Sequence, residues 1–134
     1  MDLACSWSLS TRPEEVRRAR RLAVAFARDA GLQDDVVGDV ALVVSEAVTN
    51  AVQHAFHPEP ADPAPTRILL AARSTHDRVD FFVSDNGRGL HRRPGSPGLR
   101  LGSSVIDLLA QTTRQANGPH GGAAVTMSFV RAPA

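Results

Sequence analysis

Three polar residues, Glu46, Asn50 and His54, recur at intervals of four along one stretch of the sequence. On an α-helix each would be rotated by only about 40° from the one before, so that together they border an apolar stripe. A carboxylate in such a line can act as a general base or position a water, and a carboxamide oxygen suits a hard cation. An amphipathic helix with a polar border would have the same spacing without any chemistry.

A second segment brings an aspartate to the end of an apolar run. Asp85 follows Phe81–Ser84, and Gly87 and Gly89 come two and four residues later. Glycines at these places let the backbone approach a ligand closely, and the carboxylate can accept a hydrogen bond from an exocyclic amine. Aspartate, asparagine and glycine are also ordinary turn residues, so a surface turn is the simpler alternative.

Two further glycine segments precede predicted elements. Gly98, Arg100 and Gly102 stand before a predicted helix, and the free N–H groups and positive dipole at a helix start suit a phosphate. Gly121 and Gly122 lead into the last predicted strand. Taken singly, the first segment could be a plain loop-to-helix connection and the second a turn.

Hydrophobic periodicity predicts the elements that must position these residues. Helices are expected from a cap at Ser10 or Thr11 to Gly31, then over 34–56 and 102–110, and strands over 6–9, 67–73, 78–84, 112–115 and 124–130. Prolines and glycines place loops over 57–65 and 85–97. This order predicts an α+β fold, in which helices are layered on one face of a mostly antiparallel mixed sheet.

The length of 134 residues is that of one ordinary domain, and we expect a single domain over 1–134. The composition, 43% hydrophobic and 22% charged, is globular. No apolar run approaches the roughly 18 residues of a bilayer span and no signal segment opens the chain, which predicts a cytoplasmic protein without membrane contact. Cys5 is the sole cysteine, so neither an internal disulfide nor a cysteine cluster for zinc is expected.

All 15 basic residues are arginines. Without lysine the chain has no Walker A phosphate loop, no strand lysine of an ordinary protein kinase and no Schiff-base catalysis. The predicted first helix is rich in arginine, but the net charge is only +1 and Glu14, Glu15 and Asp29 share the helix. We therefore expect a solvated or partner-facing helix and no direct contact with nucleic acid. His54 and His57 lack a third metal ligand.

In this order, the four segments resemble the GHKL superfamily of ATPases, and within it the stand-alone bacterial anti-sigma-factor serine/threonine kinases. The likeness spans Trp7 to Phe129 and is most specific over Val43–Phe56. It implies a two-layer α/β sandwich of the Bergerat type that binds ATP and Mg²⁺. It also implies a protein that binds a sigma factor and phosphorylates a small antagonist protein on serine or threonine, with a homodimer as a further expectation.

The resemblance assigns roles residue by residue. Glu46 resembles the family's catalytic base, Asn50 its magnesium ligand, and Asp85 the acceptor for the adenine amino group. Arg20 lies where the family has an arginine near its partner and the nucleotide. The nucleotide-binding set that the resemblance implies comprises Asn50, His54, Asp85, Gly87, Gly89, Gly98, Arg100, Gly102 and Gly122.

Three departures from the family pattern leave the function open, and one of them is that the loop over 91–97 is a short lid. Arg100 stands where the family often has a third glycine, although it could itself contact phosphate, and Ala123 stands where the family usually has threonine. The alternative to a kinase is therefore a non-catalytic module of the same fold, in which bound ATP sets the affinity for a protein partner. A third hypothesis is the ATP-binding fragment of a histidine kinase, whose helical hairpin with a phospho-accepting histidine is not found in these 134 residues.

Overall fold

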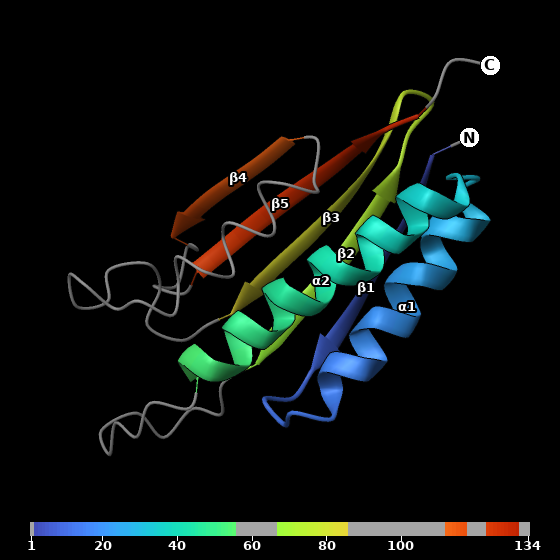
Figure 1. Cartoon of the computed structure of the whole chain (residues 1–134). Coiled ribbons are helices and arrows are strands. Elements are labelled where there is room, and N and C mark those ends of the chain that lie inside the picture. The colour runs from blue at the N-terminus through green and yellow to red at the C-terminus, as the bar shows by residue number, and fades with distance from the viewer. Residues whose placement is uncertain (1, 56–66, 86–111, 118–122, 132–134) are drawn as a thin grey trace.

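The computed structural model of the protein describes residues 2–55, 67–85, 112–117 and 123–131. Over these ranges the chain forms β1 (Leu3–Leu9), α1 (Glu15–Asp29), α2 (Asp34–Ala55), β2 (Ile68–Ser74), β3 (Arg78–Asp85), β4 (Thr112–Asn117) and β5 (Ala123–Val130). Both helices lie on the same face of the sheet (Figure 1). The predicted α+β sandwich is therefore confirmed, whereas the predicted helix over 102–110 and the loops over 57–65 and 86–97 lie outside the described residues.

The strands form one sheet in the order β1-β2-β3-β5-β4. All four pairings between the described strands are antiparallel, so a parallel pair of the predicted mixed sheet is not among them. Along β2 and β3 buried and more exposed residues alternate, because successive side chains of a strand point to opposite faces. The buried rows of these two central strands face the helices and give the sheet its inner side.

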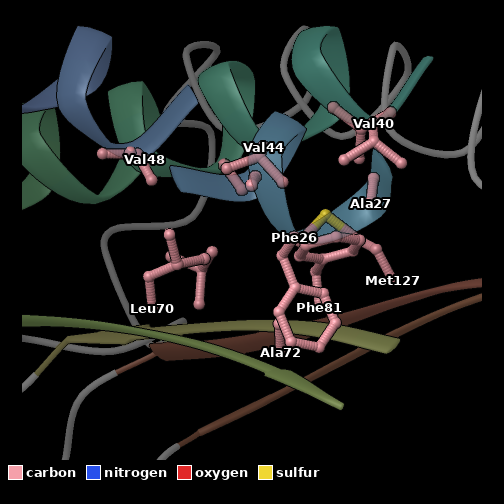
Figure 2. Close-up of a cluster of buried hydrophobic side chains, with 14 of the residues drawn as sticks. Phe26, Ala27, Val40, Val44, Val48, Leu70, Ala72, Phe81 and Met127 are labelled. Atoms are coloured by element: carbon pink, nitrogen blue, oxygen red, sulfur yellow. The ribbon is translucent and has the colours of Figure 1, made fainter. Parts of the chain in front are cut away.

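A single core fills the space between the helices and the sheet. Val40, Val44 and Val48 of α2 lie above Leu70 and Phe81 of the sheet (Figure 2). In β5, Met127 and Phe129 are buried and Val125 is packed against the same core, which confirms a strand with one inner side. At roughly 25 cal/mol per Å² of buried apolar surface, this layer is the main source of the fold's stability.

Four aromatic rings cross the core from one element to the next. The ring centroids of Trp7 and Phe26 are 6.4 Å apart, those of Phe26 and Phe81 6.0 Å, and those of Phe81 and Phe129 6.2 Å. All three pairs are edge-to-face, a geometry that adds about 0.5–1.5 kcal/mol per pair beyond the area that is buried. The rings connect β1, α1, β3 and β5 through the middle of the molecule.

The start of α1 differs from the prediction. The N-cap is Glu14, in right-handed helical conformation and without a capping side-chain hydrogen bond, rather than Ser10 or Thr11. The preceding turn already has helix-like bonds, from the Glu15 N–H to the Arg12 carbonyl at 2.9 Å and from the Val16 N–H to the Pro13 carbonyl at 3.1 Å. These bonds satisfy amide groups that a cap would otherwise have to serve, so the predicted cap was wrong.

The end of α1 follows the prediction. Gly31 has a φ of +84°, in the left-handed region that favours glycine. Its N–H donates to the Arg28 carbonyl at 2.9 Å, and the Leu32 N–H donates to the Ala27 carbonyl at 3.1 Å. These two bonds form the Schellman motif, which closes a helix at a glycine.

Arg131, directly after β5, connects three segments. Its Nη1 donates to the Ala30 carbonyl after the end of α1, its Nη2 to the Ser74 hydroxyl, and its Nε to the Thr75 carbonyl at 2.8 Å. Ser74 is the polar side chain that is buried among the described residues, with 2% of its surface exposed. A planar guanidinium can serve several acceptors at once, and its charge is favourable beside the negative end of a helix.

Neither helix of the described chain has a stretch that is long and apolar enough to cross a lipid bilayer.

Candidate functional site

The C-terminal half of α2 carries the two central site residues. Glu46 and Asn50 are both half-buried, one helical turn apart. Between and beside them Ala47, Val48 and Ala51 are buried in the core, so the predicted place at the border of the apolar stripe is confirmed. Because the adjacent core residues fix the helix, the carboxylate and the carboxamide are attached to a rigid support.

The side chains of Glu46 and Asn50 make no hydrogen bond or ion pair with the part of the chain that the structure describes. In contrast, the nearby Ser45 hydroxyl donates to the Ala41 carbonyl at 2.6 Å, one turn earlier in the same helix. A half-buried carboxylate and carboxamide usually have partners, since partial burial removes water from them. None of the described residues therefore occupies their polar atoms.

The strand register decides which way Asp85 faces. Asp85, the last residue of β3, is opposite Ile68 of β2, which is fully buried in the core. Directly opposite residues of an antiparallel pair share a face, and Asp85 also continues the period-two row of Val79, Phe81 and Val83. The half-buried carboxyl group thus belongs to the face of the sheet that the helices cover.

The direction of α2 brings this end of β3 toward Glu46 and Asn50. In Figure 2 Val40 lies on the side of Phe81 and Met127, and Val48 lies above Leu70. Leu70 is paired with Val83, so the C-terminal direction of α2 follows the C-terminal direction of β3. The C-terminal half of α2 and the end of β3 accordingly lie at the same end of the molecule (Figure 1).

The remaining predicted site residues are only partly covered. His54 belongs to α2, as its spacing predicted, but its side chain lies outside the described residues. The predicted glycines and the arginine of the phosphate and base segments also lie outside them: Gly87, Gly89, Gly98, Arg100, Gly102 and Gly122. Their roles stay predictions.

The residues present fit a magnesium nucleotide. The Asn50 carboxamide offers one hard oxygen, and Mg²⁺ usually takes one or two protein ligands and completes its octahedron with phosphate oxygens and water. The described residues contain no group of three or more histidine, cysteine, aspartate or glutamate side chains placed to hold a metal ion. Asp85, half-buried at a strand end, has the acceptor chemistry that an adenine amino group requires.

A depression of about 430 Å³ lies on the opposite face of the sheet, and it is not the predicted site. Ala4, Ala71 and Phe82 line it, in the rows of β1, β2 and β3 that alternate with the buried ones. Asp80 at its border accepts a hydrogen bond from the Ser128 hydroxyl at 2.6 Å and pairs with Arg78 at 3.2 Å. The Asp80 carboxylate is thus already bonded within the sheet.

The turn between β2 and β3 contains an aspartate whose pKa is shifted by a neighbouring side chain. The Thr75 hydroxyl donates to an Asp77 carboxylate oxygen at 2.7 Å, and this bond lowers the pKa of Asp77 below its ordinary value of 3.8. The turn lies at the start of β3, away from Asp85 at the end of that strand. The polar turn over 74–77 follows from the sequence. The Thr75–Asp77 hydrogen bond and the contacts of Arg131 do not, because in sequence these are ordinary polar residues at strand ends.

Comparisons with known proteins point to one family. Residues 9–128 match the family model described as the histidine kinase-like ATPase domain. Curated relatives include the serine-protein kinases RsbW of Listeria monocytogenes and Listeria innocua, each 34% identical over 79 residues. These alignments cover 59% of this chain and 48% of each relative, so the chain spans about half the length of the relatives it matches.

Solved structures share the fold. The RsbU and RsbW domains of Rv1364c from Mycobacterium tuberculosis superpose with a TM-score of 0.71 at 21% identity, covering 98% of this chain and 34% of that one. The histidine kinase domain of a blue-light activated histidine kinase from Erythrobacter litoralis gives a TM-score of 0.55 at 23% identity, covering 85% and 59%. The family match extends from the last residue of β1 into β5 and includes both helices and the candidate site. The chain therefore belongs to the histidine kinase-like ATPase domain family.

Proposed function

We propose that the protein is a Mg²⁺- and ATP-dependent serine/threonine protein kinase that binds a sigma factor and phosphorylates a small antagonist protein. The observation that carries the proposal is the half-buried Glu46–Asn50 pair, unpartnered within the described chain and at the same end as Asp85. The family and the similarity to serine-protein kinases named RsbW support the reaction class. We take residues 1–134 as one domain for this purpose.

In the proposed reaction Glu46 is the general base. The hydroxyl oxygen of an acceptor serine or threonine attacks the γ-phosphorus of ATP, the bond from that phosphorus to the bridging oxygen breaks, and ADP leaves. Glu46 accepts the proton of the hydroxyl as the new phosphoester bond forms. The buried residues of α2 support this assignment, because they hold the helix that carries Glu46.

Asn50 and Asp85 bind and orient rather than react. Asn50 would hold Mg²⁺ through its carboxamide oxygen, and Asp85 would accept a hydrogen bond from the adenine amino group. When bound, Mg²⁺ neutralises charge on the phosphate oxygens. Because the chain has no lysine, backbone N–H groups at a helix start, near Gly98 and Gly102, are proposed to hold the phosphates.

Transfer of labelled phosphate tests the base. Purified protein is incubated with γ-labelled ATP, Mg²⁺ and candidate small antagonist proteins, and Glu46→Gln is compared with wild type. Loss of a general base should lower the rate by roughly 10²–10⁴-fold while ATP affinity stays nearly unchanged. Gln53→Ala, an exposed change on the same helix, is the matched control. Transfer at the wild-type rate by Glu46→Gln would refute the assignment.

Nucleotide affinity tests the binding residues separately. Calorimetric titration with ATP should show that Asn50→Ala loses the dependence of affinity on Mg²⁺, while Asp85→Ala loses affinity with and without the metal. If both variants bind ATP with the same affinity as wild type, the proposed nucleotide site is wrong.

Arg100 and Ala123, which depart from the family pattern, favour a second candidate: a non-catalytic module whose partner affinity is set by bound ATP. Tight ATP binding without phosphate transfer to any acceptor, combined with nucleotide-dependent partner binding, would select this function. The possible homodimer stays a prediction, to be checked by measuring the mass in solution.

A further inference from the structure

The outward side of α1 carries a row of arginines. Five of the chain's 15 arginines lie in this 15-residue helix, and all five are exposed. Arg17, Arg21 and Arg28 are separated by four and seven residues, which places them within about 40° of one another around the helix axis. We call these three residues the arginine row. It lies on the side away from the core residues Ala23 and Phe26, which are buried.

The arginine row has no acidic partner within the described chain. Of the five arginines of α1, Arg18 forms an ion pair, with Glu15 at 3.1 Å, and it also reaches the Ser8 carbonyl at 3.4 Å. The other four are in no ion pair among the described residues, whereas Arg73 and Arg78 of the sheet share Asp80. Within the described part of the chain, the row is therefore a positive surface without an ion-paired carboxylate.

This arrangement is unfavourable for the isolated protein. Arg17 and Arg21 are like charges at i and i+4, which repel on a helix surface. Arg17 also lies in the first turn of α1, where the helix dipole disfavours a cation.

We propose that the arginine row binds the acidic surface of a partner protein, in particular a helix that presents carboxylates at matching spacing. The row is about 16 Å long, from the rise of 1.5 Å per residue, so a partner helix with glutamates at i, i+4 and i+11 can place one carboxylate opposite each arginine. Arginine binds carboxylates with two parallel hydrogen bonds, which gives such a surface geometric selectivity. Arg20, which the family resemblance already assigns, is not part of the row.

Charge complementarity favours protein over nucleic acid. The chain as a whole has a net charge of only +1. Glu14 and Asp29, both exposed, lie before the start of α1 and at its last residue. Carboxylates at both ends repel a phosphate backbone that extends past the helix, but they leave room for a short acidic helix between them.

A patterned peptide tests the proposal. The probe is a fluorescein-labelled helical peptide with glutamates at i, i+4, i+7 and i+11, compared by anisotropy with a peptide of the same composition whose glutamates are spread around the helix. Wild type should bind the patterned peptide more tightly, and the affinity should fall as salt rises. The triple variant Arg17→Ala/Arg21→Ala/Arg28→Ala should lose about tenfold in affinity, the sum expected of several exposed ion pairs.

The control removes the same charge elsewhere. Arg67→Ala/Arg73→Ala/Arg78→Ala also deletes three exposed arginines, outside α1, and should lose less than about twofold, as expected of charges far from the contact. Equal losses in both triple variants, or equal binding of both peptides, would overturn the proposal. So would tighter binding of a short DNA duplex than of the patterned peptide. Neither measurement needs ATP, so its result is independent of the proposed kinase function.

Discussion

Replacing Arg131 should destabilise the protein more than replacing an exposed arginine of α1. Arg131→Ala removes three side-chain hydrogen bonds, to Ala30, Ser74 and Thr75, and leaves the Ser74 hydroxyl buried without its charged donor. A hydrogen bond with a charged partner contributes about 1.5–3 kcal/mol, and an unsatisfied buried group costs a similar amount. Arg131 is itself half-buried and its bonds are not additive, so we expect a total loss of about 2–3 kcal/mol.

Unfolding in urea measures this loss. Trp7 is the sole tryptophan and contacts Phe26 in the core, so its fluorescence should report the loss of packing. With an unfolding entropy of about 2.1 cal/mol/K per residue, the melting temperature of the variant should fall by about 7–11 °C. Arg131→Lys should recover only part of the loss, because one ammonium group cannot serve three acceptors in the fork geometry of a guanidinium.

The matched control is Arg21→Ala, which removes an exposed arginine that has no ion pair among the described residues. Its free energy of unfolding should lie within about 0.5 kcal/mol of wild type. If Arg131→Ala behaves like this control, the Arg131 contacts do not stabilise the fold and the reasoning is refuted.

Two further predictions concern single turns. In Thr75→Val the pKa of Asp77, followed by NMR titration, should rise toward 3.8. Because this pKa is lowered in the folded protein, the bond stabilises the fold above pH 3.8, and the stabilisation is lost as the pH falls through the lower folded pKa. An unchanged titration of Asp77 would exclude the bond. Gly31→Ala should destabilise the fold by about 1 kcal/mol, because the φ of +84° at Gly31 is left-handed. Gly38→Ala should stabilise it by about 0.5–1 kcal/mol, because Gly38 lies inside α2 with open space around it. Urea midpoints that shift in the same direction for both variants would contradict this.

Local periodicity predicted most of the fold. The second helix, the buried faces of β2, β3 and β5 and the end of α1 at Gly31 follow from the spacing of apolar residues and from one glycine. The N-cap was wrong because backbone bonds of the turn before α1 replace the capping side chain. The first strand begins three residues earlier than expected, at Leu3. Its first residues belong to the strand because they pair with β2, but they are exposed and have no alternation of apolar and polar side chains that could predict this.

The candidate site could be predicted only as far as single elements determine it. Helical spacing placed Glu46 and Asn50 at the border of one apolar stripe, and the position of Asp85 at a strand end follows from the apolar run before it. That Asp85 faces the helices depends on its pairing with Ile68, which is a contact between strands. Arg131 could not be found in this way, because its partners lie 56–101 residues away in the sequence.

Within the same two turns of α2, residues that pack in the core alternate with residues that we propose to take part in the reaction. Ala47, Val48 and Ala51 are buried against the sheet, while Glu46 and Asn50 beside them carry the proposed reaction. A methyl group added or removed at Val48 would shift the helix axis and thereby move both polar groups. Sequence drift at these alanines and valines is therefore constrained by folding and also by the proposed reaction, and variants selected only for thermal resistance in this stretch should often lose the proposed phosphate transfer.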